Sequence, residues 1–293
     1  MGEGGGEMGQ AKAALSPRQG RVALQFEARE GERTHLARNF ASYPFHVTRP
    51  LYFDAGWLEL PTVVLQSAAG GLFQGDRLSV EIGVGEGAAA QVTTQSATKV
   101  HSMERDRAVQ ETRLMVGAGG HLELIADATI LFPASHVETA TTLSLAEGAS
   151  AILAEAFLWH DPKGGAAPTF SLMASTVEAR RPDGRLLARD RYRIATPADD
   201  EATRAEWQAM KAQGSLYAFG IARDGASLVE GLRAALAEVG GAYLGVSALP
   251  NEAGALVRVL APDGNIVRGV QATAWRAARR LLTGHDALIT WRK

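Results

Sequence analysis

Apolar and polar residues alternate along much of the chain, and the alternation breaks at glycine-containing turns. Apolar residues occupy every second position through 78–84, a period that predicts a strand with one buried face. A turn follows at 85–87, and a second strand is predicted at 88–94. Related strand–turn–strand units surround 117–120 and 146–148. These segments are therefore predicted to be strands joined by tight glycine turns.

The turn glycines of the three units recur at a similar spacing. Gly87, Gly119 and Gly148 are 32 and 29 residues apart, which indicates a weak internal repeat. We expect each unit to be a hairpin that is too small to bury its own apolar face. Stacked units would share one continuous core. The predicted fold is therefore mainly β, a β-helix-like or layered scaffold of stacked hairpins.

The segments outside the repeat set the limits of the predicted domain. Strands are predicted at 22–26 and 63–65, and the Pro-Asp-Gly turn at 182–184 predicts another hairpin. Residues 1–20 are rich in glycine and nearly without bulky apolar side chains, so we expect a disordered tail. We expect residues 21–293 to form a single β-rich domain.

In the final third of the chain the spacing of apolar residues changes from the alternation of strands to the spacing of helices, and we expect most of the few helices there. Residues 199–213 are predicted to form a helix that ends at Gly214. Ser227 and Glu230 form a capping box at the start of a second helix. Two further elements are predicted in this third: a hairpin at 256–267 around Pro262-Asp263-Gly264, and a last helix at 270–282.

Composition narrows the class of protein. The chain has 293 residues, of which 46% are hydrophobic, enough to bury a full core. Its 30 basic and 32 acidic residues leave a formal net charge of -2, whereas a nucleic-acid-binding face requires a basic excess. The sequence has no cysteine, and no apolar run approaches the ~20 residues that span a bilayer. Because the N-terminus also lacks a signal-peptide pattern, we expect a cytoplasmic protein with no membrane or nucleic-acid partner.

No catalytic motif is present in the sequence. It lacks the GxSxG nucleophile motif, the GxxxxGK[ST] phosphate loop and the HExxH zinc motif. Its seven histidines are scattered, without the spacing of a metal-ligand set. No two acidic residues stand out as a catalytic pair. We therefore predict that the protein is not an enzyme.

A glycine-rich turn carries the first candidate binding residues. Within 70–78 the pattern is Gly-Gly-x-x-x-Gly-Asp-Arg-Leu, in which Gly75 allows a turn that aims Asp76 and Arg77 at the mouth of a sheet. Such a corner either binds a partner or forms a structural ion pair, because turn aspartates commonly bond to nearby backbone. The sequence alone leaves both interpretations open.

Two further stretches supply polar candidates. Thr98 and Lys99 lie in the hydroxyl- and amide-rich run 93–101, which is either a binding rim or a polar edge strand. Asp127 lies inside an apolar, strand-like run, where a carboxylate must find a donor or shift its pKa. Asp127 is therefore a stronger functional candidate than a surface acid. Its structural alternative is a salt bridge to an arginine such as Arg113.

Taken together and in this order, these stretches resemble the urease accessory protein family UreD, also called UreH. The resemblance is carried by 70–78, by Thr-Thr-x-x-Ala-Thr-Lys at 93–99 and by 122–132, with the turn 84–88 between the first two. It covers about residues 33–194. The remaining hundred residues are compatible with the family in length and helix content.

The chain departs from the family pattern in two places. Many members have a proline before the acidic position and a proline or glutamate after it, whereas Ala126 and Ala128 flank Asp127 here. Within 159–170 many members have Gly-Arg followed by Gly-Glu, which this chain lacks. No glutamate of that segment is carried over, and both departures concern details of the site.

The resemblance implies a non-enzymatic chaperone for GTP-dependent nickel insertion into urease. Members of the family are β-rich scaffolds that bind the helical protein UreF, recruit the GTPase UreG through it and dock on apo-urease. Nickel is thought to pass through a polar interior tunnel, so we expect transient nickel (Ni2+) and no tightly bound cofactor. Asp127 is the candidate for transient nickel contact. Partner or tunnel candidates are Gly75, Asp76, Arg77, Thr98, Lys99 and Asp127.

Two other classes of protein serve as alternatives. A β-helical carbohydrate-active enzyme requires paired acids and aromatic platforms, but aromatic residues make up 6% of the chain. A cupin-like metal enzyme requires two or three histidines at short spacing in one strand, which the sequence lacks. For a partner scaffold we expect an apolar surface on the last-third helices, with Trp207, Met210 and Trp275 as contributors.

Overall fold

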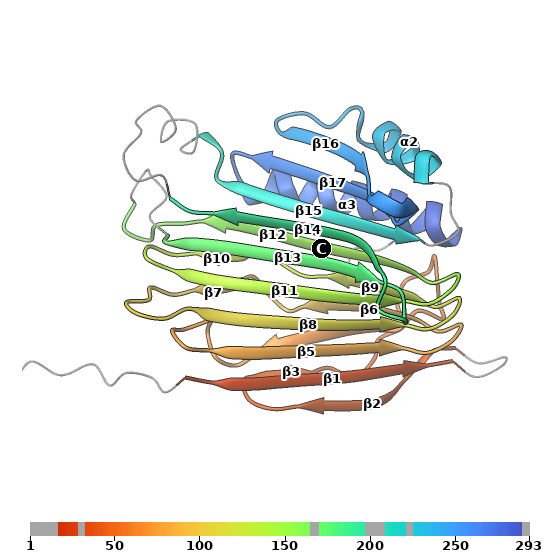
Figure 1. Cartoon of the computed structure of the whole chain (residues 1–293), viewed down its shortest axis with the longest axis horizontal. Coiled ribbons are helices and arrows are strands. Elements are labelled where there is room, and N and C mark those ends of the chain that lie inside the picture. Colours follow the sequence, from red (N-terminus) through yellow and green to blue (C-terminus); the bar gives the residue numbers. More distant parts are fainter. Residues whose placement is uncertain (1–16, 29–32, 165–169, 197–208, 221–224, 289–293) are drawn as a thin grey trace, which may run out of the picture.

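Two β-sheets face each other across a common core. The computed structural model describes residues 17–28, 33–164, 170–196, 209–220 and 225–288. One sheet has seven strands and is called sheet A here, and the other has ten and is called sheet B. Apart from the edge strands β2 and β16, which lie outside β1 and β17, the strands of each main path follow one another in sequence order across the sheet (Figure 1).

Sheet A is parallel through its centre. Its strand order is β14-β13-β11-β8-β5-β1-β2, in which β2 and β14 are antiparallel edge strands. The strands of sheet A are β1 (Gln19–Glu27), β2 (His35–Ala41), β5 (Arg77–Val84), β8 (Ala108–Val116), β11 (His136–Leu145), β13 (Leu172–Arg180) and β14 (Leu186–Ile194).

Sheet B is parallel from β4 to β12 and antiparallel at both ends. Its main order is β16-β17-β15-β12-β9-β6-β4-β3, while the short strands β7 and β10 pair with each other and β10 also pairs with β12. The strands of sheet B are β3 (Phe45–Val47), β4 (Thr62–Ser67), β6 (Ala89–Thr94), β7 (Thr98–Val100), β9 (His121–Ile125), β10 (Thr129–Leu131), β12 (Ser150–Trp159), β15 (Ala212–Gly220), β16 (Tyr243–Ala248) and β17 (Gly254–Ala261).

The three glycine turns connect the two sheets. Each turn joins a strand of sheet A to a strand of sheet B, as from β5 to β6. Gly87, Gly119 and Gly148 have φ values of 63°, 61° and 66°, and Gly87 N–H donates to the carbonyl of Ala118 in the next turn at 2.9 Å. The predicted stacking is confirmed. The two strands of a unit do not pair as a hairpin, however, because each pairs in parallel with the equivalent strand of the next unit.

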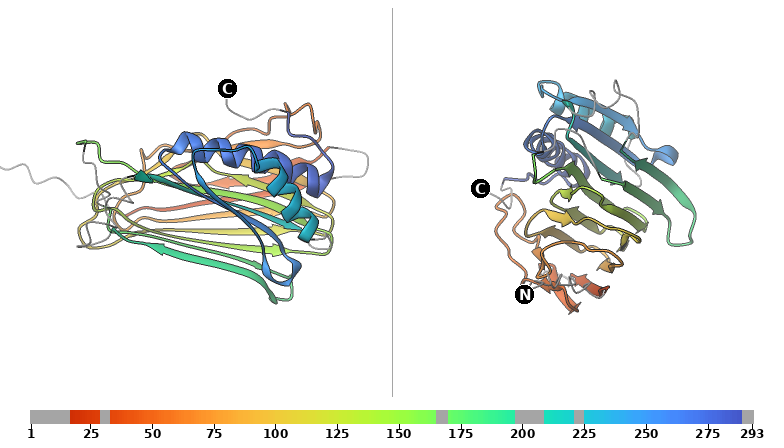
Figure 2. Two further views of the ribbon diagram at one scale, coloured as in Figure 1. Left: turned by 90° about the horizontal axis from the view of Figure 1, so that it is seen from above. Right: turned by 90° about the vertical axis from the view of Figure 1, so that its left-hand side faces the viewer.

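Two helices cover the outer face of sheet B at its C-terminal end (Figure 2). Helix α2 (Gly225–Leu236) begins two residues before the predicted cap Ser227. Helix α3 (Gly264–Thr283) contains the predicted last helix and begins earlier. No helix among the described residues is long and apolar enough to cross a membrane. A short 3₁₀ turn, η1 (Pro250–Glu252), connects β16 to β17.

Several details of the predicted elements differ from the structure. The expected hairpin around 262–264 is wrong, because Asp263 caps α3 by accepting the N–H groups of Asn265 and Ile266. The predicted helix at 199–213 falls largely outside the described residues, but Gly214 lies inside β15 instead of ending a helix. The Pro-Asp-Gly hairpin between β13 and β14 is confirmed. At the N-terminus, β1 begins at Gln19, within the predicted tail 1–20.

Candidate functional site

A belt of polar side chains interrupts the core between the two sheets. The apolar cluster near the glycine turns includes Ile82 and Leu114, and a separate apolar cluster at the other end includes Leu131 and Met173. Between them, one row of sheet A runs through neighbouring strands at Gln110, Thr139, Ser175 and Tyr192, each paired in register with the next. Glu155 of β12 lies opposite this row and bonds to two of its members.

The polar belt was missed at the sequence level. Successive units break their apolar alternation at the same register, at Gln110 in β8, at Thr139 in β11 and at Ser175 in β13. Aligning the units by their turn glycines would have shown this coincidence. One polar residue in a strand is common, whereas polar residues at the same inward position in three stacked strands indicate a polar layer inside the core, whose groups need hydrogen-bond partners.

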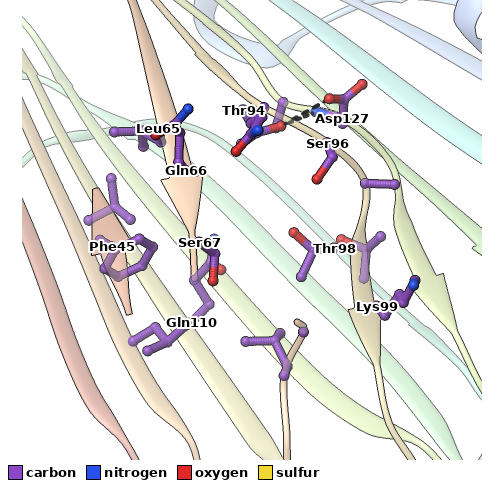
Figure 3. Close-up of a pocket in the computed structure, with 18 of the residues that line it drawn as sticks. Phe45, Leu65, Gln66, Ser67, Thr94, Ser96, Thr98, Lys99, Gln110 and Asp127 are labelled. Carbon is purple, nitrogen blue, oxygen red and sulfur yellow. Dashed lines mark hydrogen bonds between the residues drawn. The ribbon is translucent and has the colours of Figure 1, made fainter. Parts of the chain in front are cut away.

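Asp127 lies at the sheet B side of this belt. Asp127 follows β9 and precedes β10, so the prediction that it lies inside a strand is wrong. Its side chain is half-buried. Its N–H donates to Thr94 Oγ1 at 2.8 Å, and the Thr94 hydroxyl is 3.4 Å from Asp127 Oδ2 (Figure 3). Arg113, the alternative salt-bridge partner, instead lies on the exposed face of sheet A, where its Nη2 is 2.6 Å from Glu111 Oε2.

Three cavities meet at Asp127. The first, of about 240 Å³, opens beside Gly70 and is lined by Thr98, Lys99 and Gln110 (Figure 3). A second, of about 100 Å³, lies deeper between the sheets. The third, of about 390 Å³, lies against α3 on the outer face of sheet B. Asp127 lines all three and therefore borders cavities on both faces of sheet B.

Glu155 is the second acid of the deep cavity. Its carboxyl group accepts hydrogen bonds from Ser175 Oγ at 3.0 Å and Tyr192 Oη at 3.0 Å, with Tyr217 Oη at 3.3 Å. Removal from bulk water raises the pKa of Glu155, and its contacts with hydroxyl groups offset this only in part. Sequence reasoning did not single out Glu155, whose nearest polar contacts come from residues 20 to 62 positions away.

The predicted corner at Asp76 is a structural ion pair. Asp76 is 1% exposed and accepts the Phe73 N–H at 2.8 Å and Arg18 Nε at 3.0 Å. Arg77 turns away from it, donating to the Arg107 carbonyl at 3.0 Å. Gly75, with φ of 82°, turns the chain against Pro17. These residues therefore hold the start of β1 against the turn and do not line the cavities at Asp127.

Thr98 and Lys99 are at the mouth of the 240 Å³ cavity. Both belong to β7, where Thr98 N–H donates to the carbonyl of Ala128 at 3.0 Å and so ties β7 to the segment that follows Asp127. Gly71 closes the mouth from the other side: a Cβ there would lie 2.4 Å from the Lys99 carbonyl oxygen, so the close approach requires glycine. The structure therefore brings Thr98, Lys99 and Asp127 together and separates them from Asp76 and Arg77.

Another buried acid, Glu123, holds α3 on the outer face of sheet B. Arg279 donates to both of its carboxyl oxygens at 2.7 Å, and Trp275 Nε1 donates at 2.8 Å. Burial alone would raise the pKa of Glu123, but hydrogen bonds from Arg279 and His121 lower it to about 2. Trp275 is 5% exposed, so its predicted place on a partner surface is wrong; Trp207 lies outside the described residues.

Oxygen atoms dominate the possible ligands in the polar belt. Among the residues with described positions, no three His, Asp or Glu side chains are grouped so that they could hold a metal ion. Carboxylate, hydroxyl and amide oxygens around Asp127 would therefore provide weak, exchangeable contacts for a divalent cation. A closed metal cage requires more ligands than this.

Comparison with known proteins gives a consistent result. The family model described as "UreD urease accessory protein" matches residues 18–292, which extends the resemblance through the C-terminal third. A relative named urease accessory protein UreD 1, from Methylorubrum extorquens, is 38% identical over 92% of each chain. Urease accessory protein UreD from Haloarcula marismortui is 35% identical over 92% of this chain and 89% of its own length.

Proposed function

Because the chain belongs to the UreD family of urease accessory proteins, we propose that it is a non-enzymatic scaffold that passes nickel to apo-urease during urease maturation. The observation that carries the proposal is the meeting of three cavities at Asp127. A carboxylate at such a junction attracts a divalent cation, and half-burial keeps it reachable by water.

The oxygen-rich lining supports transit over storage. From the 240 Å³ cavity a cation would meet Thr98 and then Thr94 and Asp127, and the deep cavity continues toward Glu155. Hydroxyl and carboxylate contacts exchange readily because none of them is a strong soft ligand. Nickel is in this scheme the cargo of the protein, held briefly and released.

The proposal includes the partners and the compartment that the family resemblance implies. UreF would bind this chain, the GTPase UreG would join through UreF, and the assembly would deliver nickel in the cytoplasm with GTP hydrolysis. The relatives reported above are named as accessory proteins, which supports a scaffold more than a β-helical carbohydrate-active enzyme.

The experiment that tests the proposal replaces Asp127 by Asn in the complex with UreF and UreG. Asp127→Asn keeps the shape and the bond to Thr94 but removes the charge, so we expect an intact complex and several-fold less nickel in urease, measured by metal analysis. Asp183→Asn, in the exposed turn before β14, is the matched control and should leave nickel unchanged. Normal nickel in urease matured with Asp127→Asn, or loss of the complex, would overturn the transit role.

A further inference from the structure

A chain of hydrogen bonds leads from the deep cavity to the protein surface. Glu155 lines the cavity, and its Oε1 is 3.3 Å from Tyr217 Oη. The Tyr217 hydroxyl is 2.6 Å from Asp190 Oδ2. Asp190 pairs with Arg258, and their side chains are 22% and 35% exposed, so the outer end of the chain reaches water.

The hydroxyl of Tyr217 determines how protons are arranged along this chain. It has one proton and two acidic neighbours, and the shorter contact is to Asp190, which forms an ion pair with Arg258. When Tyr217 donates its proton to Asp190, the contact between Tyr217 and Glu155 can be a hydrogen bond only if Glu155 is protonated and donates to the Tyr217 oxygen. Burial raises the pKa of Glu155, which agrees with a carboxylic acid at this position.

A divalent cation in the cavity would change this arrangement. Its charge of two is only half neutralised by the carboxylate of Asp127, and an uncompensated charge inside a protein is costly. Loss of one proton from Glu155 would supply the second negative charge. That proton needs an acceptor, and the contact of Glu155 that continues to another carboxyl group runs through Tyr217 to Asp190.

We propose that Glu155, Tyr217 and Asp190 form a proton exit path that is used when a divalent cation enters the cavity at Asp127. The Oε–H bond of Glu155 breaks as an O–H bond to Tyr217 Oη forms, and the original Tyr217 proton moves to Asp190. Asp190 then releases it to water, so cation entry and proton release balance. This inference rests on the proposed cation passage.

The other polar groups around Glu155 do not extend the path. Tyr192 donates to Glu155 at 3.0 Å and has the guanidinium of Arg258 over its ring at 5.0 Å. Ser175 bonds to both oxygens of Glu155 from β13. Burial raises the pKa of both tyrosines, so neither holds a charge near neutral pH. Tyr192 thus resembles Tyr217 in chemistry and contact to Glu155, and it lacks the link to Asp190.

Proton release can be measured directly on the full chain in complex with UreF. Ni2+ is titrated by calorimetry in buffers of different ionisation enthalpy, which gives the number of protons released per cation. We expect about one proton fewer for Glu155→Gln than for the wild type, since the amide has no acidic proton. An equal number in both, or no nickel binding by the wild type, would overturn the exit path.

The rate of proton release shows whether the Tyr217 hydroxyl carries the proton or whether any hydroxyl group near Glu155 has the same effect. Stopped-flow mixing with Ni2+ and a pH indicator should show release slowed about tenfold or more in Tyr217→Phe. Tyr192→Phe loses one hydroxyl contact to the same carboxyl group and should release protons at the wild-type rate. Equal rates in the two variants would overturn the role of Tyr217.

The two proposals fail in different ways. If Asp127→Asn leaves nickel delivery unchanged, cation passage itself is wrong. If Asp127→Asn blocks delivery while Glu155→Gln releases as many protons as the wild type, passage stands and the exit path alone is wrong.

Discussion

Two glutamates on neighbouring strands of sheet B, Glu123 buried and Glu155 half-buried, have opposite surroundings. Glu123 on β9 faces α3, and Glu155 on β12 faces sheet A, although the two strands pair in parallel. Glu123 is 0% exposed and receives two hydrogen bonds from Arg279. The carboxyl group of Glu155 instead contacts the hydroxyl groups of Ser175, Tyr192 and Tyr217.

The difference in surroundings means that Glu123 has a structural role, whereas Glu155 can gain or lose a proton. The guanidinium of Arg279 fixes Glu123 as a carboxylate and ties α3 to the sheet, so its charge cannot respond to a cation. Glu155 has hydroxyl donors and a cavity on one side, and its pKa is raised by burial. Shifted titratable groups that border cavities are the usual candidates for function. The two glutamates should therefore respond oppositely to substitution.

Removing Arg279 should have the largest effect. Arg279→Leu leaves Glu123 and Asp54 buried without their shared cation, and breaking a buried ion pair in this way costs about 3–5 kcal/mol. Urea unfolding of the purified complex, compared with Arg276→Leu at the rim of the outer cavity, measures the loss. A loss similar to that of Arg276→Leu would mean that Glu123 is not held by Arg279.

Acid should weaken the same cluster. The pKa of Glu123 is about 2 in the folded protein and near 4.5 in the unfolded chain, so its stabilisation is complete above 4.5. It is lost as the pH falls through that range toward 2, by on the order of 3 kcal/mol. Unfolding free energies of the wild type and Glu123→Gln should therefore converge at low pH. Parallel curves would contradict a depressed pKa.

A smaller loss is expected at Asp76, whose partner Arg18 is 16% exposed and so keeps some contact with water. Asp76→Asn removes the charge that pairs with Arg18 but keeps an oxygen for the Phe73 N–H, so we expect a loss of about 1–3 kcal/mol. Thermal unfolding measures it. Because Asp76 does not line the cavities at Asp127, nickel delivery per folded complex should not change, and a change would bring Asp76 back as a functional residue.

Substituting Glu155 should have the smallest effect on stability. Its raised pKa means that wild-type stability falls as the pH rises from the unfolded pKa through the folded one. The glutamine of Glu155→Gln does not titrate, so this pH dependence is absent in the variant. The free energy of unfolding of the variant should differ from that of the wild type by less than about 1 kcal/mol at neutral pH, and it should increase relative to the wild type as the pH rises. A large loss with Glu155→Gln would make Glu155 a structural acid like Glu123.

Local patterns predicted the stacking well and the pairing poorly. Glycines with positive φ at 87, 119 and 148 mark the turns, but a turn that crosses the core and one that closes a hairpin have the same local sequence. The Pro-Asp-Gly triplet shows the same limit: it makes a hairpin at 182–184 and caps a helix at 262–264. Parallel pairing depends on residues about thirty positions away, which no local window contains.

The candidate site was predictable in part. Asp127 was identified from one acid in an apolar run, and the structure places it with Thr98 and Lys99 around one cavity. Asp76 was identified from its place in a glycine-rich turn, yet Arg18, 58 residues away, makes it structural. Glu123 and Arg279 are 156 residues apart, so their pairing needed the fold. The repeated polar register at Gln110, Thr139 and Ser175 was available in the sequence but required the correct unit alignment.

The central claim is that a divalent cation enters the interior at Asp127, and anomalous X-ray scattering tests it most directly. Crystals of the chain in complex with UreF, soaked with Ni2+, would be measured at the nickel absorption edge, with Asp127→Asn crystals as the comparison. We predict an anomalous peak within about 2.5 Å of an Asp127 carboxylate oxygen in the wild type and its loss in the variant. Peaks confined to surface histidines, or an interior peak that persists in Asp127→Asn, would contradict the claim.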